Sequence, residues 1–339
     1  MANKNLHKFK DIENNMQKEA LTNEVKGNLF EFLVAQYLAR SFNIEAQYLN
    51  KCDPSMLSSF RQYEAWLRKN HKDLLTYLPI LAEHTAKTIF DYVDKHFKQI
   101  PKEIVTVGKI AAGFHNDEYG EADIIIVLDD RIVPISLKLC KNNAYLSTKS
   151  AGAKSFFSRY FEAFDDAAFY QTTFNSIIDK GFSEFGESLY ERKGLDFSGS
   201  FDKQWIFGEL PGKLKGEDKE ELNSFYQIIL KNLHEITMTL LKSDESLFKK
   251  SLHPLMGYSS SNILQAVCYY KTKNKVPYQH ERSFIHDPQE ISSVIVDEYS
   301  DHKSSFNLRL DNNILQLRVK PMNKFTTKSY KINCSVLYQ

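Results

Sequence analysis

The stretch Gly120-Glu-Ala-Asp-Ile-Ile-Ile-Val-Leu-Asp-Asp-Arg-Ile-Val-Pro-Ile-Ser-Leu-Lys138 predicts two strands joined by a tight polar turn. Its first apolar run, residues 124–128, is rich in β-branched side chains, which is typical of a strand buried on both faces. Asp129 and Asp130 supply the turn, and residues 132–139 form the returning strand. We therefore expect a buried β-hairpin here.

This hairpin would gather four polar side chains at one end of a sheet. If the turn is centred on its two aspartates, Asp123 faces Ser136 and Glu121 faces Lys138. Side chains two residues apart on a strand share a face, so all four would point the same way. Grouped carboxylates suit a hard divalent cation, and a lysine beside them suits a developing negative charge. The pattern suggests a metal-dependent phosphodiesterase.

An Asp that opens one strand, followed by x-x-Lys on the next, resembles the PD-(D/E)XK superfamily, the restriction-endonuclease-like nucleases. The matching residues are Asp123 and the half-motif Ser136-Leu137-Lys138. Ala122 stands in place of Pro, and Ser136 stands in place of the acidic residue, which removes one expected metal ligand. The resemblance implies an α/β (α+β) fold, with a restriction-endonuclease-like core in which helices flank a central mixed sheet. Members with such a replacement usually recruit a carboxylate from elsewhere.

A helix is predicted over residues 22–40, with Thr22 or Asn23 as its N-cap. At about 100° per residue, one apolar arc gathers its larger side chains. These are Phe30, Leu33, Val34, Tyr37 and Leu38. Gly27 lies inside the arc, where a missing side chain would let another element approach, and Glu31 lies at its edge.

The superfamily often opens with such a helix, written roughly Gly-x-x-x-Glu-x-x-Val-Ala, whose Glu reaches the metal site. Gly27, Glu31, Val34 and Ala35 match that pattern. The resemblance therefore makes Glu31 the first candidate to replace the missing ligand. The next candidates are Glu121 and then Glu118.

The same resemblance assigns a role to each residue of the site. Asp123 and Glu31 would bind Mg²⁺, with Glu121 as a further ligand, and water on the metal would attack the phosphorus in line. Lys138 would orient or activate that water, or stabilise the pentacovalent charge. Ser136 would hold a metal-bound water or act as a weak ligand.

A simpler interpretation of these residues stays open. Asp123, Glu121 and Lys138 would then form a cross-strand ion pair at a sheet end, worth about 0.2–1 kcal/mol. Glu31 would be a solvated carboxylate at the helix boundary. A register slip of one residue would send Asp123 and Ser136 to opposite faces and dissolve the site.

Charge is distributed unevenly along the chain, although the net charge is only +1. Residues 101–130 carry two basic and seven acidic groups, a net charge of −5. Residues 131–160 carry six basic groups and no acid. An acidic metal cradle followed by a basic run is what phosphodiester cleavage needs, because one part holds cations and the next holds the phosphate backbone.

The run 141–155 is rich in small hydrogen-bonding and basic residues. We expect several of them to contact DNA phosphates, partly through backbone N–H groups near Gly152. They are Lys141, Ser147, Thr148, Lys149, Ser150 and Lys154. The alternative is a polar loop that starts a helix at Ser155.

The last segment is also basic, since residues 303–339 contain seven Lys or Arg against one acid. Residues 305–320 alternate as in a hairpin with its turn at 311–313, and a final strand over 330–338 is expected to join it. Basic side chains here would line a duplex groove or track its backbone. They are Arg309, Arg318, Lys320, Lys324 and Lys328. A solvated basic face is the alternative.

Length and composition set the outer limits. With 339 residues and 42% hydrophobic content, the chain can bury a sizeable core, as one elaborated domain or two packed ones. We expect residues 1–160 to form the nuclease core, with a helical insertion at about 50–100. Residues 161–339 would then form a helical module with a C-terminal β-hairpin for DNA recognition.

The expected location is cytoplasmic, without a membrane span. The N-terminus lacks the apolar region of a signal peptide, and no run approaches about 18 apolar residues. The four cysteines lie far apart in sequence, without the spacing of metal ligands, and are expected to be reduced thiols.

These observations favour a Mg²⁺-dependent endonuclease acting on double-stranded DNA. Because the chain is longer than a minimal core of this type, the resemblance favours a site-specific type II restriction enzyme. Such an enzyme would be a homodimer if its target is palindromic, and a cognate methyltransferase would be its partner. One alternative is a phage, repair or recombination nuclease that reads DNA structure. The other is a catalytically inactive DNA-binding protein on the same fold.

Overall fold

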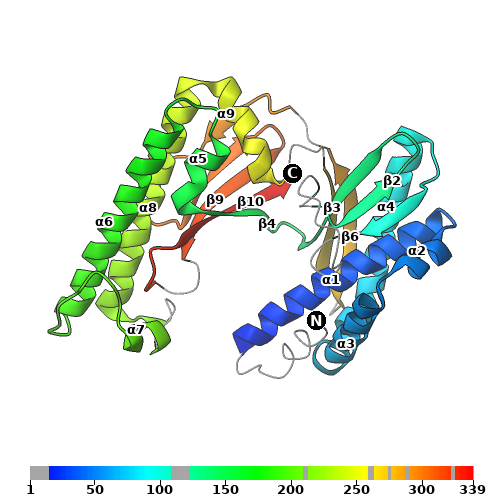
Figure 1. The fold of residues 1–339 in the computed structure, drawn as a ribbon, viewed down its shortest axis with the longest axis horizontal. Coiled ribbons are helices and arrows are strands. Elements are labelled where there is room, and N and C mark those ends of the chain that lie inside the picture. Colours follow the sequence, from blue (N-terminus) through cyan, green and yellow to red (C-terminus); the bar gives the residue numbers. More distant parts are fainter. Residues whose placement is uncertain are drawn as a thin grey trace. The chain divides into compact units, whose positions relative to one another are not determined.

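The computed structural model describes residues 15–107, 119, 122–208, 213–258, 263–273, 276–287, 290–321 and 325–338 (Figure 1). It contains helices and two five-stranded sheets, so the expected mixed α/β class is confirmed. The chain divides into two compact units. Unit 1 comprises residues 1–144 and 258–289, and unit 2 comprises residues 145–257 and 290–339.

Four helices precede the first strand of unit 1. They are α1 (Asn15–Ser41), α2 (Glu45–Lys51), α3 (Pro54–Asn70) and α4 (Lys72–Phe97). The expected N-cap at Thr22 is wrong, because Thr22 lies within α1 and its hydroxyl donates to the carbonyl of Lys18 at 2.7 Å. A true cap precedes α3, where the Asp53 carboxylate accepts from the N–H of Ser55.

Sheet 1 of unit 1 is a mixed sheet with the strand order β1-β2-β3-β5-β6. Its strands are β1 (Glu103–Thr106), β2 (Ile124–Val127), β3 (Ile132–Lys141), β5 (Leu264–Lys273) and β6 (Val276–His286). β3 and β5 are parallel, and the other neighbours are antiparallel. Ile124 faces Ile135, and Val127 faces Ile132, so the predicted hairpin register is confirmed.

The two faces of sheet 1 differ in what covers them. Alternate strand residues such as Ile124, Ile135 and Ala266 share one large apolar core with α1, α3 and α4. The side chains between them in sequence point to the other face, where a smaller cluster includes Ile125 and Ile263. Asp123 and Ser136 belong by their spacing to this second face.

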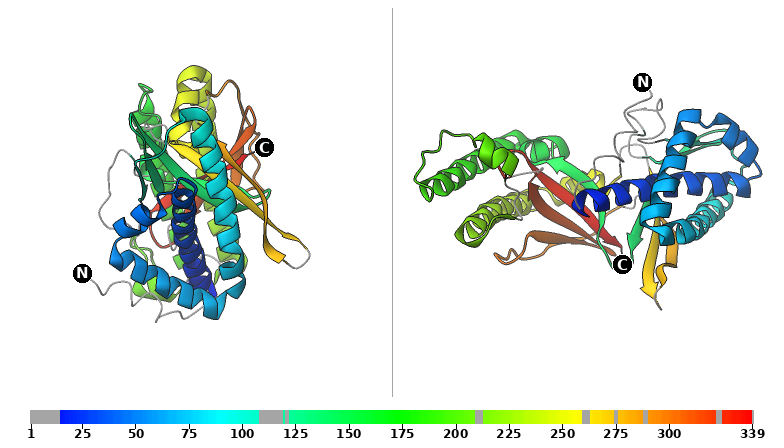
Figure 2. Two further views of the ribbon diagram at one scale, coloured as in Figure 1. Left: turned by 90° about the vertical axis from the view of Figure 1, so that its right-hand side faces the viewer. Right: turned by 90° about the horizontal axis from the view of Figure 1, so that it is seen from below.

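The segment expected as a helical insertion is indeed helical, since α3 and α4 occupy it. However, α4 packs along α1 and against β5 and β6, and its buried side chains belong to the main core of unit 1 (Figure 2). Residues such as Leu78, Leu81 and Ile89 are almost fully buried there. The segment is therefore part of the hydrophobic core of unit 1.

Sheet 2 of unit 2 is antiparallel throughout, with the order β4-β10-β9-β8-β7. Its strands are β4 (Leu146–Gly152), β7 (Val294–Val296), β8 (Ser305–Leu310), β9 (Asn313–Pro321) and β10 (Tyr330–Tyr338). The expected C-terminal hairpin and final strand are confirmed. The polar run after β3 is not a loop, because β4 pairs with β10, which lies far away in the sequence.

Helices of unit 2 cover one face of this sheet. The elements are η3 (Ala153–Ser155), α5 (Phe156–Tyr160), α6 (Ala167–Glu191), α7 (Lys203–Gly208), α8 (Gly216–Ser243), α9 (Glu245–Leu252) and η5 (His253–Met256). α6 and α8 run side by side (Figure 1). α8 contacts the sheet through the ring pairs Phe225–Tyr330 and His234–Phe306.

The two units differ from the contiguous division expected at residue 160. The hairpin of β5 and β6 returns to unit 1, because β5 pairs in parallel with β3 and completes its sheet. The four cysteines are free, as expected. Within the described part of the chain, no helix has both the length and the apolar character needed to cross a membrane.

Candidate active site

Asp123 lies directly before β2, at the point where the predicted hairpin places it opposite Ser136. Its Oδ2 accepts a hydrogen bond from the N–H of Leu137 at 2.6 Å and a longer one from the hydroxyl of Ser136 at 3.3 Å. Among the described residues these are the only donors to the carboxylate, so its Oδ1 is left without one. That oxygen is a suitable ligand for a hard cation.

Lys138 joins this pair through Ser136. Its Nζ donates to the Oγ of Ser136 at 2.7 Å, while the Ser136 hydroxyl donates to Asp123. Ser136 is almost completely buried, whereas Asp123 and Lys138 are partly exposed. The three side chains therefore form one chain of polar contacts that runs from the Asp123 carboxylate to the Lys138 ammonium group.

Burial dominates the electrostatics of Asp123. Desolvation raises the pKa of its carboxyl above the ordinary value, while the charge of Lys138 and the hydrogen bonds from Leu137 and Ser136 act in the opposite direction. The ionised carboxylate is thus incompletely compensated by the protein. A bound divalent cation would supply the missing compensation.

Two further polar residues extend the row across the sheet, and sequence analysis missed both. Gln265 of β5 lies in register with Ser136, and His286 of β6 lies in register with Gln265. Gln265 is fully buried, and the Tyr258 hydroxyl contacts Nδ1 of His286. Burial of its ring lowers the pKa of His286. Their position beside Ser136 could not be predicted from the sequence, because β3 and β5 are more than a hundred residues apart.

Glu31 lies on α1 and is partly exposed. α1 contributes to the large core on one face of sheet 1, whereas Asp123 and Ser136 belong by spacing to the other face, so the role of Glu31 as a ligand stays a prediction. We expected another element to approach Gly27 closely, but none of the described residues does so. A Cβ there would lie 4.0 Å from Oε1 of Glu31, and no closer contact is made by the described residues.

The donor set for Mg²⁺ is incomplete within the described residues. No three His, Cys, Asp or Glu side chains gather there in a way that could hold a metal ion. Glu121 and Glu118, the other candidate ligands, lie outside the described residues. Asp123 fits a hard cation by its Oδ1, which accepts no hydrogen bond from the described residues, and by its incompletely compensated charge, and Ser136 offers a second, weaker oxygen.

The residues expected to contact phosphates separate into two groups. Lys141 is exposed at the end of β3, and Ser147 and Ser150 are exposed on β4. Thr148 instead donates to the carbonyls of Leu255 and Cys334 within unit 2. The Thr148 hydroxyl is therefore engaged inside unit 2, and a phosphate contact for it stays a prediction.

Lys149 is the register partner of Cys334, whose side chain is buried. Desolvation lowers the pKa of its ammonium group, and the nearby charge of Arg159 adds to the effect. Its side chain therefore belongs to the helix-covered side of sheet 2. A phosphate contact would need this half-buried group to reach solvent.

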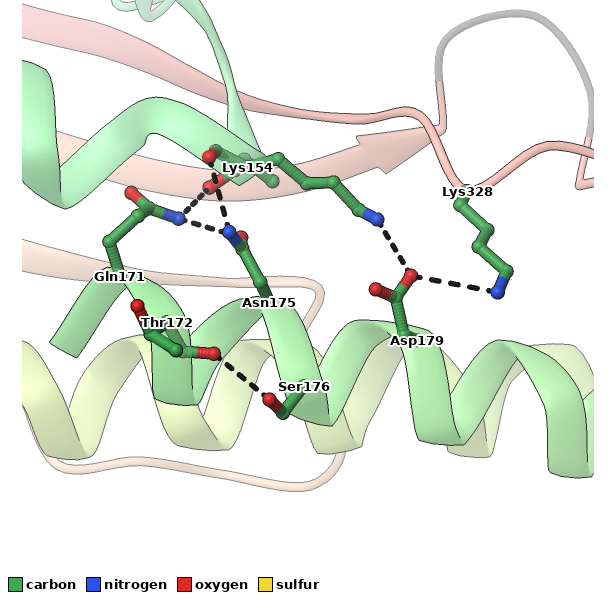
Figure 3. A network of polar contacts seen from close by, with 8 residues as sticks. Lys154, Gln171, Thr172, Asn175, Ser176, Asp179 and Lys328 are labelled. Atoms are coloured by element: carbon green, nitrogen blue, oxygen red, sulfur yellow. Dashed lines mark hydrogen bonds and ion pairs between the residues drawn. The ribbon is translucent and has the colours of Figure 1, made fainter. Parts of the chain in front are cut away.

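Lys154 is engaged in a polar network around the start of α6 (Figure 3). Its Nζ lies 2.6 Å from Oδ1 of Asp179, and the Nζ of Lys328 lies 3.8 Å from the same oxygen. Nearby, the amide of Gln171 donates to the carbonyl of Ala153 and to Asn175. Two lysines share one carboxylate, so the network keeps a surplus positive charge.

The three basic residues of the C-terminal hairpin have different surroundings. Arg309 of β8 is paired with Asp297, with 2.6 Å between Nε and Oδ1. Arg318 and Lys320 of β9 are exposed. Lys324 lies outside the described residues. Arg318 and Lys320 are therefore the better placed of the three to meet an anion.

Comparison of the chain with protein-family models, with curated proteins and with solved structures gives no match.

Proposed function

We propose that the chain is a Mg²⁺-dependent endonuclease that hydrolyses phosphodiester bonds in DNA. The observation that carries the proposal is the chain of contacts from Lys138 through Ser136 to Asp123. It sets a cation-binding oxygen and a positive charge at one sheet end, which is the pairing needed to bind a phosphodiester and stabilise its transition state.

Each residue then has a distinct task. Asp123 would hold the metal, together with Glu31 or Glu121, while the N–H of Leu137 holds Oδ2 in place. The metal, when bound, supplies a water of lowered pKa and a Lewis acid. Lys138 stabilises negative charge that develops on the phosphoryl oxygens. Ser136, fixed by burial, orients the Lys138 ammonium group.

The mixed sheet supports the same proposal at the level of the fold. Helices pack on sheet 1, and Asp123 and Lys138 come from two neighbouring strands of it, as the resemblance to the PD-(D/E)XK nucleases implies. A restriction-endonuclease-like core is therefore part of the proposal. The proposal also includes a cytoplasmic location, site specificity as a type II restriction enzyme, a homodimer and a partner methyltransferase.

The proposal is tested by incubating the protein with several long DNAs in Mg²⁺. Controls are EDTA and the variant Lys138→Ala. Discrete fragments that disappear in both controls support a site-specific enzyme. A smear that disappears in both controls supports a nuclease that reads DNA structure or cuts without specificity. Intact DNA under all conditions would overturn the catalytic proposal.

A second function is favoured by one observation, the serine at position 136. Because an acidic ligand is missing there, the fold could bind DNA without cutting it. A silent binder would shift DNA on a gel without cleavage, and Lys138→Ala would change neither result. Absence of both binding and cleavage would leave Asp123 and Lys138 as a sheet-end charge pair.

A further inference from the structure

Among the described residues, the helices of unit 2 lie on one face of sheet 2, and the other face carries polar and basic side chains. Along β9 and β10 the buried side chains alternate with partly or fully exposed ones, so the second set shares the opposite face. Arg318 and Lys320 of β9 belong to this set, as do Lys331 and Asn333 of β10. We call these four residues, with Ser150 of β4, the open face.

The strands that form the open face carry no acid. β4, β7, β8, β9 and β10 contain neither Asp nor Glu. Asp297 follows β7 and pairs with Arg309. Within the described part of the chain, Arg318, Lys320 and Lys331 have no ion-pair partner. No ion pair with a described residue therefore compensates the positive charge of Arg318, Lys320 and Lys331.

Two of these charges oppose each other directly. Lys331 of β10 is the register partner of Lys320 of β9. Like charges directly opposite on neighbouring strands destabilise a sheet, because their Cβ atoms lie about 4.5–5.5 Å apart. The free protein gains nothing from this arrangement. A ligand that carries closely spaced negative charges would relieve it.

Hydrogen-bonding groups accompany the charges. Arg318 is the register partner of Asn333, and Asn333 is the partner of Ser150 on the next strand. The Ser150 hydroxyl donates to Oδ1 of Asn333 at 2.8 Å, which confirms that these side chains share a face. The open face thus offers amide and hydroxyl groups beside the guanidinium, the mixture that contacts phosphate and sugar oxygens in DNA complexes.

We propose that the open face docks the phosphate backbone of double-stranded DNA, with Arg318, Lys320 and Lys331 each contacting a phosphate. The proposal builds on the proposed function, from which it takes DNA as the partner. The proposal is supported by the charge complementarity between the open face and the DNA backbone. DNA presents one negative charge per about 1.7 Å of helix axis, and neighbouring strands place basic groups about 4.8 Å apart. A docking surface on unit 2 is separate from the residues that perform the chemistry in unit 1.

The test is DNA binding by the full chain in EDTA, where no cleavage occurs. Fluorescence anisotropy of a labelled duplex is measured over a range of salt concentrations for the wild type and for the triple variant Arg318→Gln, Lys320→Gln, Lys331→Gln. The matched control is Lys215→Gln, Lys219→Gln, Lys231→Gln. These three lysines are exposed at the start of α8 and along it.

The open-face variant is expected to bind at least about tenfold more weakly at about 0.1 M salt. Its log–log salt slope should be shallower by about 2.7, since each lost phosphate contact contributes about 0.9. The control should bind as the wild type does. Melting temperature should not fall in the open-face variant, because a like-charge contact is removed.

Equal weakening in both variants, or none in the open-face variant, would overturn the proposal. So would equal binding of polyglutamate and duplex DNA by the wild type, because the face would then be a general polyanion surface. Failure here is distinguishable from failure of the proposed function. If the wild type binds DNA through the open face but does not cleave it in Mg²⁺, the proposed function fails while this proposal stands.

Discussion

The Nζ of Lys138 lies 2.7 Å from the Oγ of Ser136, two residues before it on β3. In the motif that the chain resembles, an acid would stand at position 136 and would pair with the lysine charge. A serine holds the ammonium group in place without neutralising it. In the proposed site this replacement removes one metal ligand, so Asp123 would take a larger share of the cation.

Removal of the Ser136 hydroxyl should slow cleavage without abolishing it. In Ser136→Ala, Lys138 loses its acceptor and Asp123 loses one donor. A hydrogen bond to a charged group is worth about 1.5–3 kcal/mol, so a rate loss of roughly 10–100-fold is expected. Single-turnover cleavage measures it. Ser58→Ala on the exposed side of α3 is the control, and a wild-type rate in Ser136→Ala would show that the serine has no positioning role.

Asp123→Asn should remove the response of stability to Mg²⁺. A ligand that binds only the folded state stabilises it by about 2.7 kcal/mol at a concentration of 100 Kd. The wild-type melting temperature should therefore rise as Mg²⁺ is added, while the variant should not respond. In EDTA the variant should melt above the wild type, because it no longer carries an ionised carboxylate that burial disfavours. An equal Mg²⁺ shift in both proteins would exclude Asp123 as the ligand.

Asp311 should make unit 2 sensitive to acid. Hydrogen bonds from Ser292 and Ser293 lower the pKa of its carboxyl to about 2, from an ordinary value of 3.8. A lowered pKa means that the contribution to stability is complete above the ordinary value and is lost as pH falls through the folded value. Urea unfolding between pH 5 and pH 2, as a rough window around these values, should therefore show a steeper loss for the wild type than for Asp311→Asn. Parallel curves would contradict this assignment.

Gly181→Ala should destabilise the contact between α6 and α8. Alanine is intrinsically better than glycine in a helix by about 0.8–1 kcal/mol. At this position, however, a Cβ would lie 2.6 Å from the ring of Phe225, which is buried. Overpacking typically costs about 1–3 kcal/mol, so a net loss is expected. Urea unfolding measures it, with the exposed Ser176→Ala of α6 as the control, and a more stable variant would contradict the packing.

Local patterns were enough to predict the hairpin of β2 and β3. Its two strands are joined by a short turn, so alternation and turn position together set the register that brings Asp123 opposite Ser136. The C-terminal hairpin was predicted for the same reason. The helix start at Thr22 was not, because a hydroxyl that bonds back to the carbonyl of Lys18 has the same sequence signal as a cap.

Pairing between distant segments could not be predicted from local patterns. β5 completes sheet 1 beside β3, and β4 joins sheet 2 through β10, so the two compact units do not follow the contiguous division expected at residue 160. Gln265 was missed on the same account, because its place beside Ser136 is created by that parallel pairing. The charge surplus of the C-terminal segment was visible in the sequence. The direct opposition of Lys320 and Lys331 was not.

The most direct test of the central claim is conversion of supercoiled plasmid DNA by the wild type and by two lysine variants in Mg²⁺. Lys138→Ala removes the proposed catalytic ammonium group, and Lys95→Ala removes an exposed lysine of α4 in the same unit. Circular dichroism spectra establish that all three proteins are folded. We predict nicked or linear DNA with the wild type and Lys95→Ala, and supercoiled DNA alone with Lys138→Ala or with EDTA. Equal cleavage by Lys138→Ala, or cleavage that persists in EDTA, would contradict the account.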